Sequence, residues 1–232
     1  MEALILAAGL GTRLRPLTDD RPKALVEVGG ATLLERNIGR VAAAGATHCV
    51  INVHYFGDKL IEYLAGHEWP CSVSISDERQ QLLDTGGALK HAAPHFRGDG
   101  PVLVHNVDIL SDIDLKALEE HHRRSGNLVT LCCCQRPTTR MLLFDKRGNL
   151  AGIYGQTDAT GMQALPFSGV SMVSPELFDL MPADDHPYPV FGCYLQLARN
   201  HRIGYYMHPK GRWIDVGTPE AVAQAADLYV TP

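Results

Sequence analysis

The chain has 232 residues, 45% of them hydrophobic and 20% charged, which is the composition of an ordinary folded protein with one sizeable core. A formal net charge of −5 argues against nucleic acid or an anionic membrane surface as the partner, so we expect a small-molecule ligand. No apolar run is long enough to span a membrane and no basic leader precedes the first one, so we expect a cytoplasmic protein.

The first 137 residues alternate between short apolar runs and amphipathic segments of helical periodicity. Thr32 is placed to cap the first helix, and Gly45 to end it. The pattern predicts strands at 3–8, 48–55, 71–78, 101–110 and 128–136, and helices at 33–45, 58–66, 85–96 and 114–126. This alternation predicts an α/β fold with a doubly wound, mostly parallel, Rossmann-like sheet that binds ligands at the carboxyl ends of its strands.

The regular alternation of strands and helices ends at about residue 138, after which we expect a smaller and more antiparallel part. The sequence predicts a hairpin over 141–155, a strand and short helix over 168–181, and a segment 188–200 that is helical in its second half. Thr218 is expected to cap a last helix that has Pro219 at its first position. No repeat or linker divides the chain, so we expect one domain over residues 1–232.

Six cysteines occur, and none forms a CxxC pair. Cys132, Cys133 and Cys134 are adjacent and would alternate between the two faces of a strand, so they cannot converge on one tetrahedral metal ion. We therefore expect free thiols that pack as small hydrophobic side chains in a reducing compartment.

The segment AAGLGTRLRPLT, residues 7–18, places a glycine-rich turn directly after the first strand. Gly9 and Gly11 allow close approach of a ligand to the backbone, and Arg13, Arg15 and Lys23 supply cations near that turn. The segment fits neither the dinucleotide fingerprint nor the P-loop. It still indicates a site for a polyphosphate.

Extended to residue 25, the segment reads AAGLGTRLRPLTDDRPKAL and resembles the signature of the sugar-1-phosphate nucleotidyltransferases. The resemblance implies a GT-A-like fold in which Lys23 lies between the α-phosphate of a nucleoside triphosphate and the sugar phosphate. It also implies a nucleotide site lined by Ala7, Ala8, Gly9, Gly11, Thr12 and Arg13.

Three further segments are similar to motifs of that family. LDTGGALKHA (83–92) would present Thr85, Gly86 and Gly87 to the base. VHNVDIL (104–110) would place Asn106 beside the nucleotide and Asp108 on a metal ion, with Val107 where the family usually has glycine. WIDVGTP (213–219) would supply Asp215 as the second metal-binding carboxylate.

The reaction of this family needs this set of charges. A sugar phosphate oxygen attacks the α-phosphorus while pyrophosphate leaves, so the obstacle is repulsion between anions and the useful groups are cations and metal ions. On the resemblance, Arg13, Lys23 and Asp108 are the catalytic residues, and Asp108 and Asp215 hold Mg²⁺. Residues 1–137 would mainly bind the nucleotide, and residues 138–232 the sugar phosphate.

The acceptor sugar is indicated by FSGVSMVSPELF (167–178), which is similar to a stretch of the short N-acetylmuramate-1-phosphate uridylyltransferases of cell-wall recycling. That similarity implies UTP as donor and places Ser168 and Gly169 at the acceptor. The mid-chain lysine segment of many relatives is missing, with Lys146 and Lys210 as alternatives.

Other activities stay open at this point, as does the oligomeric state. A mannose- or heptose-1-phosphate guanylyltransferase has the same motifs. A phosphocholine cytidylyltransferase would need an aromatic cage, for which Trp69, Tyr188, Phe191 and Tyr194 are available. A non-catalytic relative would be expected to have lost Lys23, Asp108 or Asp215, which are all present.

Overall fold

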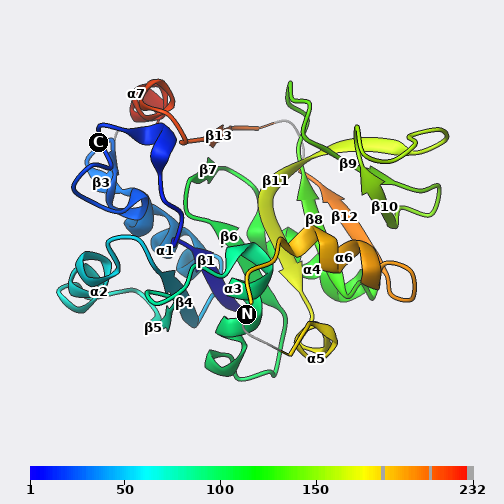
Figure 1. The fold of residues 1–232 in the computed structure, drawn as a ribbon, viewed down its shortest axis with the longest axis horizontal. Coiled ribbons are helices and arrows are strands. Elements are labelled where there is room, and N and C mark those ends of the chain that lie inside the picture. The colour runs from blue at the N-terminus through cyan, green and yellow to red at the C-terminus, as the bar shows by residue number, and fades with distance from the viewer. Residues whose placement is uncertain (184–185, 209–210, 229–232) are drawn as a thin grey trace.

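The computed structural model describes residues 1–183, 186–208 and 211–228 (Figure 1). Within them, nine strands form one sheet in the order β10-β9-β11-β6-β1-β4-β5, with β8 also paired to β11 and β12 to β8. The strands of this sheet are β1 (Glu2–Leu6), β4 (His48–Val53), β5 (Ser72–Asp77), β6 (Val102–Asn106), β8 (Val129–Cys133), β9 (Met141–Phe144), β10 (Leu150–Ile153), β11 (Gln163–Val173) and β12 (Ile203–Met207). The helices are α1 (Leu33–Ala43), α2 (Gly57–Ala65), α3 (Asp84–Ala92), α4 (Leu115–Ser125), α5 (Glu176–Leu180), α6 (Val190–Leu197) and α7 (Pro219–Leu228).

The predicted parallel sheet is confirmed in the N-terminal half, where β6, β1, β4 and β5 all run parallel. Helix α1 begins where the sequence indicated, because the Thr32 hydroxyl accepts a hydrogen bond from the amide of Glu35 and the Glu35 carboxylate accepts one from the amide of Thr32. Thr218 caps α7 by accepting a hydrogen bond from the amide of Ala221 at 3.3 Å, without the reciprocal bond of a capping box.

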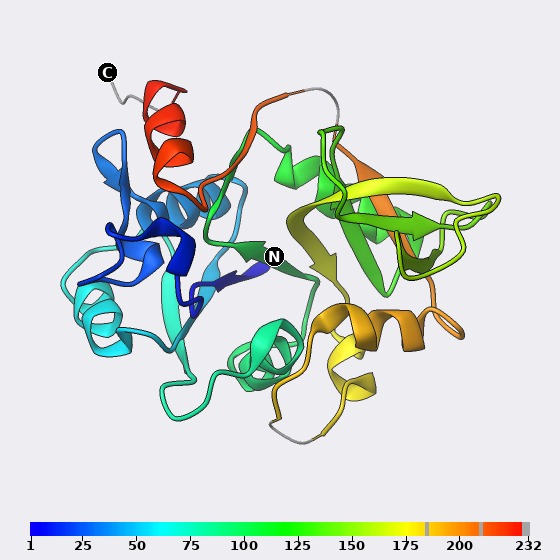
Figure 2. The same cartoon turned by 45° about the horizontal axis from the view of Figure 1, so that its top comes forward.

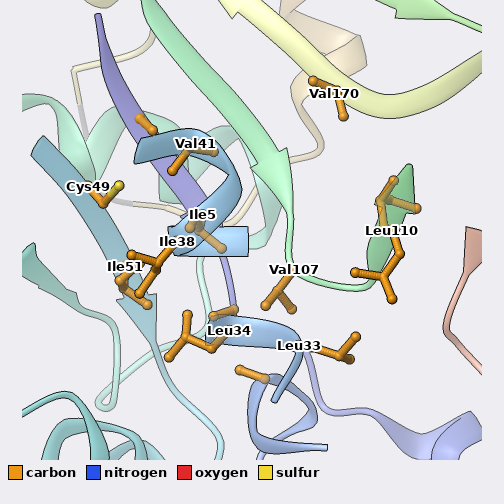
Figure 3. Packing of buried hydrophobic residues seen from close by; sticks show 14 of the residues in the cluster. Ile5, Leu33, Leu34, Ile38, Val41, Cys49, Ile51, Val107, Leu110 and Val170 are labelled. Carbon is orange, nitrogen blue, oxygen red and sulfur yellow. The ribbon is translucent and has the colours of Figure 1, made fainter. Parts of the chain in front are cut away.

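Two hydrophobic clusters lie on opposite faces of the sheet, because successive residues of a strand point to opposite sides. Ile5 of β1 packs with α1, where Leu34 and Ile38 are completely buried (Figure 3). Leu4, its neighbour in β1, packs on the other face with Leu89 of α3 and Tyr194 of α6. The sheet is therefore covered on both faces, as a doubly wound fold requires.

The three adjacent cysteines follow the same alternation. Cys132 belongs to the cluster under α1 and Cys133 to the cluster under α3. Burial raises the pKa of the Cys132 thiol to about 12, so it stays protonated and apolar. All six cysteines are free thiols, as predicted.

The structure differs from the sequence-based prediction in the C-terminal half. Strand β11 runs antiparallel between β6 and β8, so β8 is not the next neighbour of β6 in the parallel run. Helix α6 already begins at Val190 rather than in the second half of its segment, because the hydroxyl of Thr85 accepts a hydrogen bond from the Val190 amide at 3.0 Å. The hairpin of β9 and β10 is confirmed.

The predicted strand 101–110 is interrupted after Asn106. The backbone turns at Val107 and Asp108 and resumes as β7 (Ile109–Ser111), which pairs antiparallel with β13 (Trp213–Asp215). In Figure 2 β13 and the segment that leads from it to α7 run across the top of the molecule, and α7 packs on β2 (Glu27–Val28) of the small β2–β3 (Ala31–Thr32) hairpin. This ribbon brings Asp215 and Val216 to the turn that follows β6.

Candidate active site

The polar residues of the site gather where four parallel strands end. The loop 7–11 follows β1, Asn52 lies at the end of β4, Glu78 directly follows β5, and Asn106 ends β6. Parallel strands place their carboxyl ends along one edge of a sheet, which is where α/β proteins bind ligands.

The glycine-rich segment forms a turn, as its sequence predicts. Gly11 has a φ of 62°, and its carbonyl accepts hydrogen bonds from the amide of Leu14 at 2.9 Å and the hydroxyl of Thr18 at 2.8 Å. A Cβ atom at position 11 would lie 3.0 Å from the Thr18 methyl group and 3.2 Å from Cβ of Lys23. Glycine is therefore needed here both for the backbone angle and for the close approach of Lys23.

A buried polar network holds the start of this loop. The side-chain oxygen of Asn52 accepts hydrogen bonds from the amides of Ala7 at 2.6 Å and Ala8 at 3.3 Å, and its amide group donates to Glu78 at 2.8 Å. Glu78 also accepts from the amide of Leu83, which precedes α3. Burial raises the pKa of the Glu78 carboxyl.

This network changes what Ala7 and Ala8 contribute to the site. Both were predicted to bind the nucleotide, but their amide hydrogens point to Asn52 and not to a ligand. Sequence reasoning missed Asn52 and Glu78. Their signal was a polar residue at the end of each of two neighbouring strands.

The charged centre of the site brings together residues that are far apart in the sequence. Lys23 forms an ion pair with Asp108, in which both side chains are mostly buried. Arg13 lies 3.9 Å from Asp215, and that arginine is 60% exposed. Burial and the nearby carboxylate of Asp108 raise the pKa of Asp215, although Lys23 and Arg13 oppose the shift.

The ribbon of β7 and β13 explains why the two carboxylates meet. Asp215 pairs with Ile109 in that ribbon, and the amide of Val216 donates a hydrogen bond to the carbonyl of Asp108 at 2.8 Å. Because Asp108 immediately precedes β7, this register places both aspartates at the same end of the ribbon.

The first of two cavities at this edge has a volume of about 480 Å³ and lies between the loop and α3. Among the residues predicted to bind or process the nucleotide, six line it: Ala8, Gly9, Lys23, Thr85, Asn106 and Asp108. Ala7, Gly11, Thr12, Arg13, Gly86 and Gly87 do not line it. Asn52, Glu78 and Pro187, none of them predicted, do.

Gly86 and Gly87 have a packing role in the structure. A Cβ atom at Gly86 would lie 2.3 Å from the ring of Tyr188, and one at Gly87 would lie 2.7 Å from the carbonyl oxygen of His186. The amide of Gly86 donates to the carbonyl of Tyr188 at 2.9 Å. These glycines therefore let the segment before α6 lie against α3, which brings Pro187 to the cavity wall.

The second cavity, of about 410 Å³, lies beyond the aspartates and is bounded mainly by the C-terminal half. Asn106 lines both cavities, so they are adjacent. Gly169, predicted at the acceptor, lines this cavity together with Asp215, whereas the side chain of Ser168 is completely buried outside it. Arg136 and Trp213 also line it and were not predicted.

Of the two lysines considered for the acceptor phosphate, Lys146 does not lie at this cavity. Lys146 is exposed in the turn between β9 and β10 and does not line the cavity. Lys210 lies outside the described residues.

The aromatic residues considered for a choline cage do not converge. Phe191 and Tyr194 contact each other at the C-terminal half of the sheet, with ring centroids 5.9 Å apart. Trp69 packs near Tyr63 in the cluster on the opposite face. A quaternary ammonium site built from all of these rings is therefore absent from the part of the chain that the structure describes.

The donor set at Asp108 and Asp215 fits Mg²⁺. One carboxylate oxygen of Asp215 is buried without a hydrogen-bond partner, and carboxylate oxygens are the ligands that Mg²⁺ prefers. No group of three or more metal-ligating side chains occurs among the described residues. Two carboxylates suffice for an ion that takes its remaining ligands from substrate phosphates and water.

No helix in the described ranges is long and apolar enough to cross a membrane.

Comparison with known sequences agrees with the geometry. The nucleotidyl transferase family matches residues 2–142. An N-acetylmuramate alpha-1-phosphate uridylyltransferase of Caulobacter vibrioides is 37% identical over 94% of this chain and 93% of its own length. The protein of that name from Neisseria meningitidis serogroup B is 34% identical over 98% of each chain. A mannose-1-phosphate guanyltransferase of Debaryomyces hansenii is 28% identical over this whole chain but only 65% of its own length.

Solved structures share the fold at lower identity. HddC from Yersinia pseudotuberculosis, complexed with GMP-PN, superposes with a TM-score of 0.79 at 22% identity, covering 98% of this chain and 99% of that one. An apo UDP-glucose pyrophosphorylase superposes with a TM-score of 0.80 at 16% identity, covering 99% and 98%. Sequence and fold thus agree: the chain belongs to the nucleotidyl transferase family, as an enzyme that acts on sugar 1-phosphates.

Proposed function

We propose that the enzyme transfers a uridylyl group from UTP to N-acetylmuramate 1-phosphate, or to a related N-acetylhexosamine 1-phosphate, and releases pyrophosphate. The observation that carries this proposal is the identity of 34% and 37%, over nearly the full length of both chains, with two N-acetylmuramate alpha-1-phosphate uridylyltransferases. The product would be a UDP-linked sugar for cell-wall precursor recycling. The free state of all six cysteines supports activity in the cytoplasm.

We assign the donor to the first cavity and the acceptor to the second. The first is lined almost wholly by residues before 109, with Pro187 as the exception, whereas the second is lined mainly by residues after 135. This distribution supports a division of labour between residues 1–137 and 138–232. The two substrates would then meet at Asn106, which both cavities share.

In this arrangement an oxygen of the sugar phosphate attacks the α-phosphorus of UTP in line with the departing pyrophosphate. The attacking oxygen is already ionised, so no general base is needed. Lys23 releases Asp108 and turns its ammonium group to the α-phosphate, where negative charge gathers. Arg13, which is largely exposed and close to Asp215, neutralises the leaving phosphates.

Asp108 and Asp215 would hold Mg²⁺ in this reaction. A bound Mg²⁺ would supply positive charge that offsets the repulsion between the two anionic substrates. Asp108 and Asp215 would be its protein ligands, and Lys23 would then be free to leave Asp108 for the α-phosphate.

A guanylyltransferase acting on mannose or heptose 1-phosphate is the second candidate. It is supported by the guanyltransferase of Debaryomyces hansenii, which matches this chain along its whole length.

The two candidates are separated by pyrophosphate release from the purified enzyme with Mg²⁺, crossing UTP, GTP, CTP, dTTP and ATP with a panel of sugar 1-phosphates. We expect turnover with UTP and N-acetylmuramate 1-phosphate, and none with the Asp108→Ala variant. Turnover with GTP and a mannose or heptose phosphate, in the absence of turnover with UTP, would refute the uridylyltransferase.

A further inference from the structure

The second cavity has its own source of positive charge. Fifteen described residues line it, and the charged ones among them are Arg136, Arg140 and Asp215. Arg140 is exposed, whereas Arg136 is partly buried. Within the described residues, neither arginine forms a salt bridge with a carboxylate.

Arg136 is held in one orientation by its surroundings. Its guanidinium lies 4.2 Å from the centroid of the Trp213 ring, and it donates a hydrogen bond to the carbonyl of Phe167 at 3.1 Å. Trp213 is itself fixed, because its indole N–H donates to the carbonyl of Ser168 at 2.8 Å. Two successive carbonyls of β11 thus orient the stacked pair, and a guanidinium that is already oriented loses little freedom when it binds a ligand.

The same guanidinium has hydrogen-bonding capacity left over. Its Nε atom is buried and has no hydrogen-bond partner, which is unusual for a buried polar group. The bond to Phe167 uses one of its five N–H groups, and the Cys134 thiol also contacts the guanidinium. Donors are thus left for an oxyanion, which a guanidinium binds through two parallel hydrogen bonds.

The acceptor phosphate needs a cation near the second cavity to balance its charge. The acceptor brings a phosphate into a region that already contains Asp108 and Asp215, while Lys23 and Arg13 lie with those aspartates and serve the donor. Trp213 and Asp215 are two residues apart in β13, so both side chains lie on the same face of that strand. Arg136, stacked on Trp213, therefore lies in the same cavity as Asp215 and close to it along β13.

We propose that Arg136 binds an anionic group of the acceptor sugar. It would thereby take the place of the mid-chain lysine that many relatives have and this chain lacks. This inference rests on the acceptor assignment made above for the second cavity. In the proposed acceptor two groups have the required chemistry: the 1-phosphate, which every acceptor has, and the carboxylate of muramate. Both present two oxygens in the spacing of the guanidinium fork.

The test uses Arg136→Met, which keeps an unbranched apolar chain over Trp213 and removes the charge, and Arg136→Lys, which keeps the charge and removes the fork. Arg147→Met is the matched control, because Arg147 is exposed in the β9–β10 turn and lines neither substrate cavity. We expect Arg136→Met to raise KM for the acceptor by about 10- to 100-fold, as for a lost charge-assisted hydrogen bond, and to leave KM for UTP within about twofold. Arg136→Lys should recover part of the loss.

Two acceptors separate the possible anions. If Arg136 binds the 1-phosphate, Arg136→Met raises KM for N-acetylmuramate 1-phosphate and for N-acetylglucosamine 1-phosphate alike. If Arg136 binds the carboxylate, only KM for the muramate substrate rises. An unchanged acceptor KM for both, or an equal rise in KM for UTP, would overturn the proposal.

Failure of the substrate assignment is a separate outcome. It would appear as lack of turnover of these substrates by the wild-type enzyme, and the same variants would then be compared on the sugar 1-phosphate that the wild type does use. Calorimetric binding of N-acetylmuramate 1-phosphate, which carries both anionic groups, gives a readout without nucleotide that needs no turnover. Weaker binding to Arg136→Met than to Arg147→Met supports the inference, and equal binding refutes it.

Discussion

Replacement of Asn52 by leucine should release the glycine-rich loop by leaving buried polar groups without partners. Leucine has a similar size, but it cannot accept from the amides of Ala7 and Ala8 or donate to Glu78. Asn52 is 3% exposed, so water does not replace these bonds in the folded protein.

The magnitude follows from the number and quality of the lost bonds. Each buried group that loses its partner costs about 1–3 kcal/mol. The bond from Ala7 is short at 2.6 Å and that to Glu78 is 2.8 Å, whereas the bond from Ala8 is long at 3.3 Å and contributes little. Two strong bonds therefore predict a loss of about 2–6 kcal/mol of unfolding free energy, or a Tm lower by roughly 4–24 °C for a chain of this size.

Urea denaturation at pH 5 and pH 8 is the assay, with Asn52→Asp as the matched variant. Aspartate still accepts from both loop amides, but it faces the carboxylate of Glu78. The two carboxyls share a proton at low pH and repel each other when both are ionised, so Asn52→Asp should lose stability between pH 5 and pH 8. Asn52→Leu should also be destabilised more at pH 8 than at pH 5, because the Asn52 amide lowers the pKa of the buried Glu78 carboxyl, but this difference should be smaller than for Asn52→Asp; its KM for UTP should rise.

The reasoning would be refuted by an Asn52→Leu protein whose unfolding free energy lies within about 0.5 kcal/mol of the wild type at both pH values. Such a result would mean that the loop amides find other partners, and that the network does not hold the loop.

Three further predictions follow from the site and the core. Gly86→Ala should lower the Tm and raise KM for UTP by about tenfold or more, because its Cβ atom would lie 2.3 Å from the Tyr188 ring and displace the cavity wall; thermal melts and donor titrations check this. Lys23→Met should lower kcat by about 10²–10³-fold, measured by pyrophosphate release, and a fall of less than tenfold would contradict its role at the α-phosphate. Burial lowers the pKa of His122 to about 4, so the unfolded chain binds a proton that the folded one does not, and stability falls as pH drops from about 6.5 toward 4. His122→Gln should remove about 2 kcal/mol of the difference in unfolding free energy between pH 7 and pH 5, and an unchanged difference would show that this histidine is not neutral in the fold.

The local elements of the fold were predictable because their signals are local. The capping box of Thr32 and Glu35 and the apolar run of β1 depend on residues that are near in the sequence. The position of β11 was not predictable, because it depends on which of several apolar strands pairs with β6, and strand pairing leaves no periodic signal in a single sequence. The break between β6 and β7 was missed for the same reason, since it needs β13 as a partner.

For the site, the sequence indicated the charged residues better than the residues that support them. Lys23 and Asp108 were found from motifs, and the structure shows them as an ion pair. Asn52 has no motif of its own, because its role depends on the backbone amides that approach it from a different strand. Arg136 was missed because its orientation depends on stacking against Trp213. That residue is far away in the sequence and is brought to Arg136 by β13.

The central place of β11 has a consequence for how the protein reaches its fold. Its first residues pair with β9, and its last residues pair with β6 on one side and β8 on the other. Both β6 and β8 are synthesised earlier, so each has an unpaired apolar edge until residue 173 has left the ribosome. Long-range pairing of this kind slows folding, and unpaired edges favour association with other chains. Until β11 has formed and paired with β6 and β8, the growing chain is therefore exposed to aggregation through these two edges.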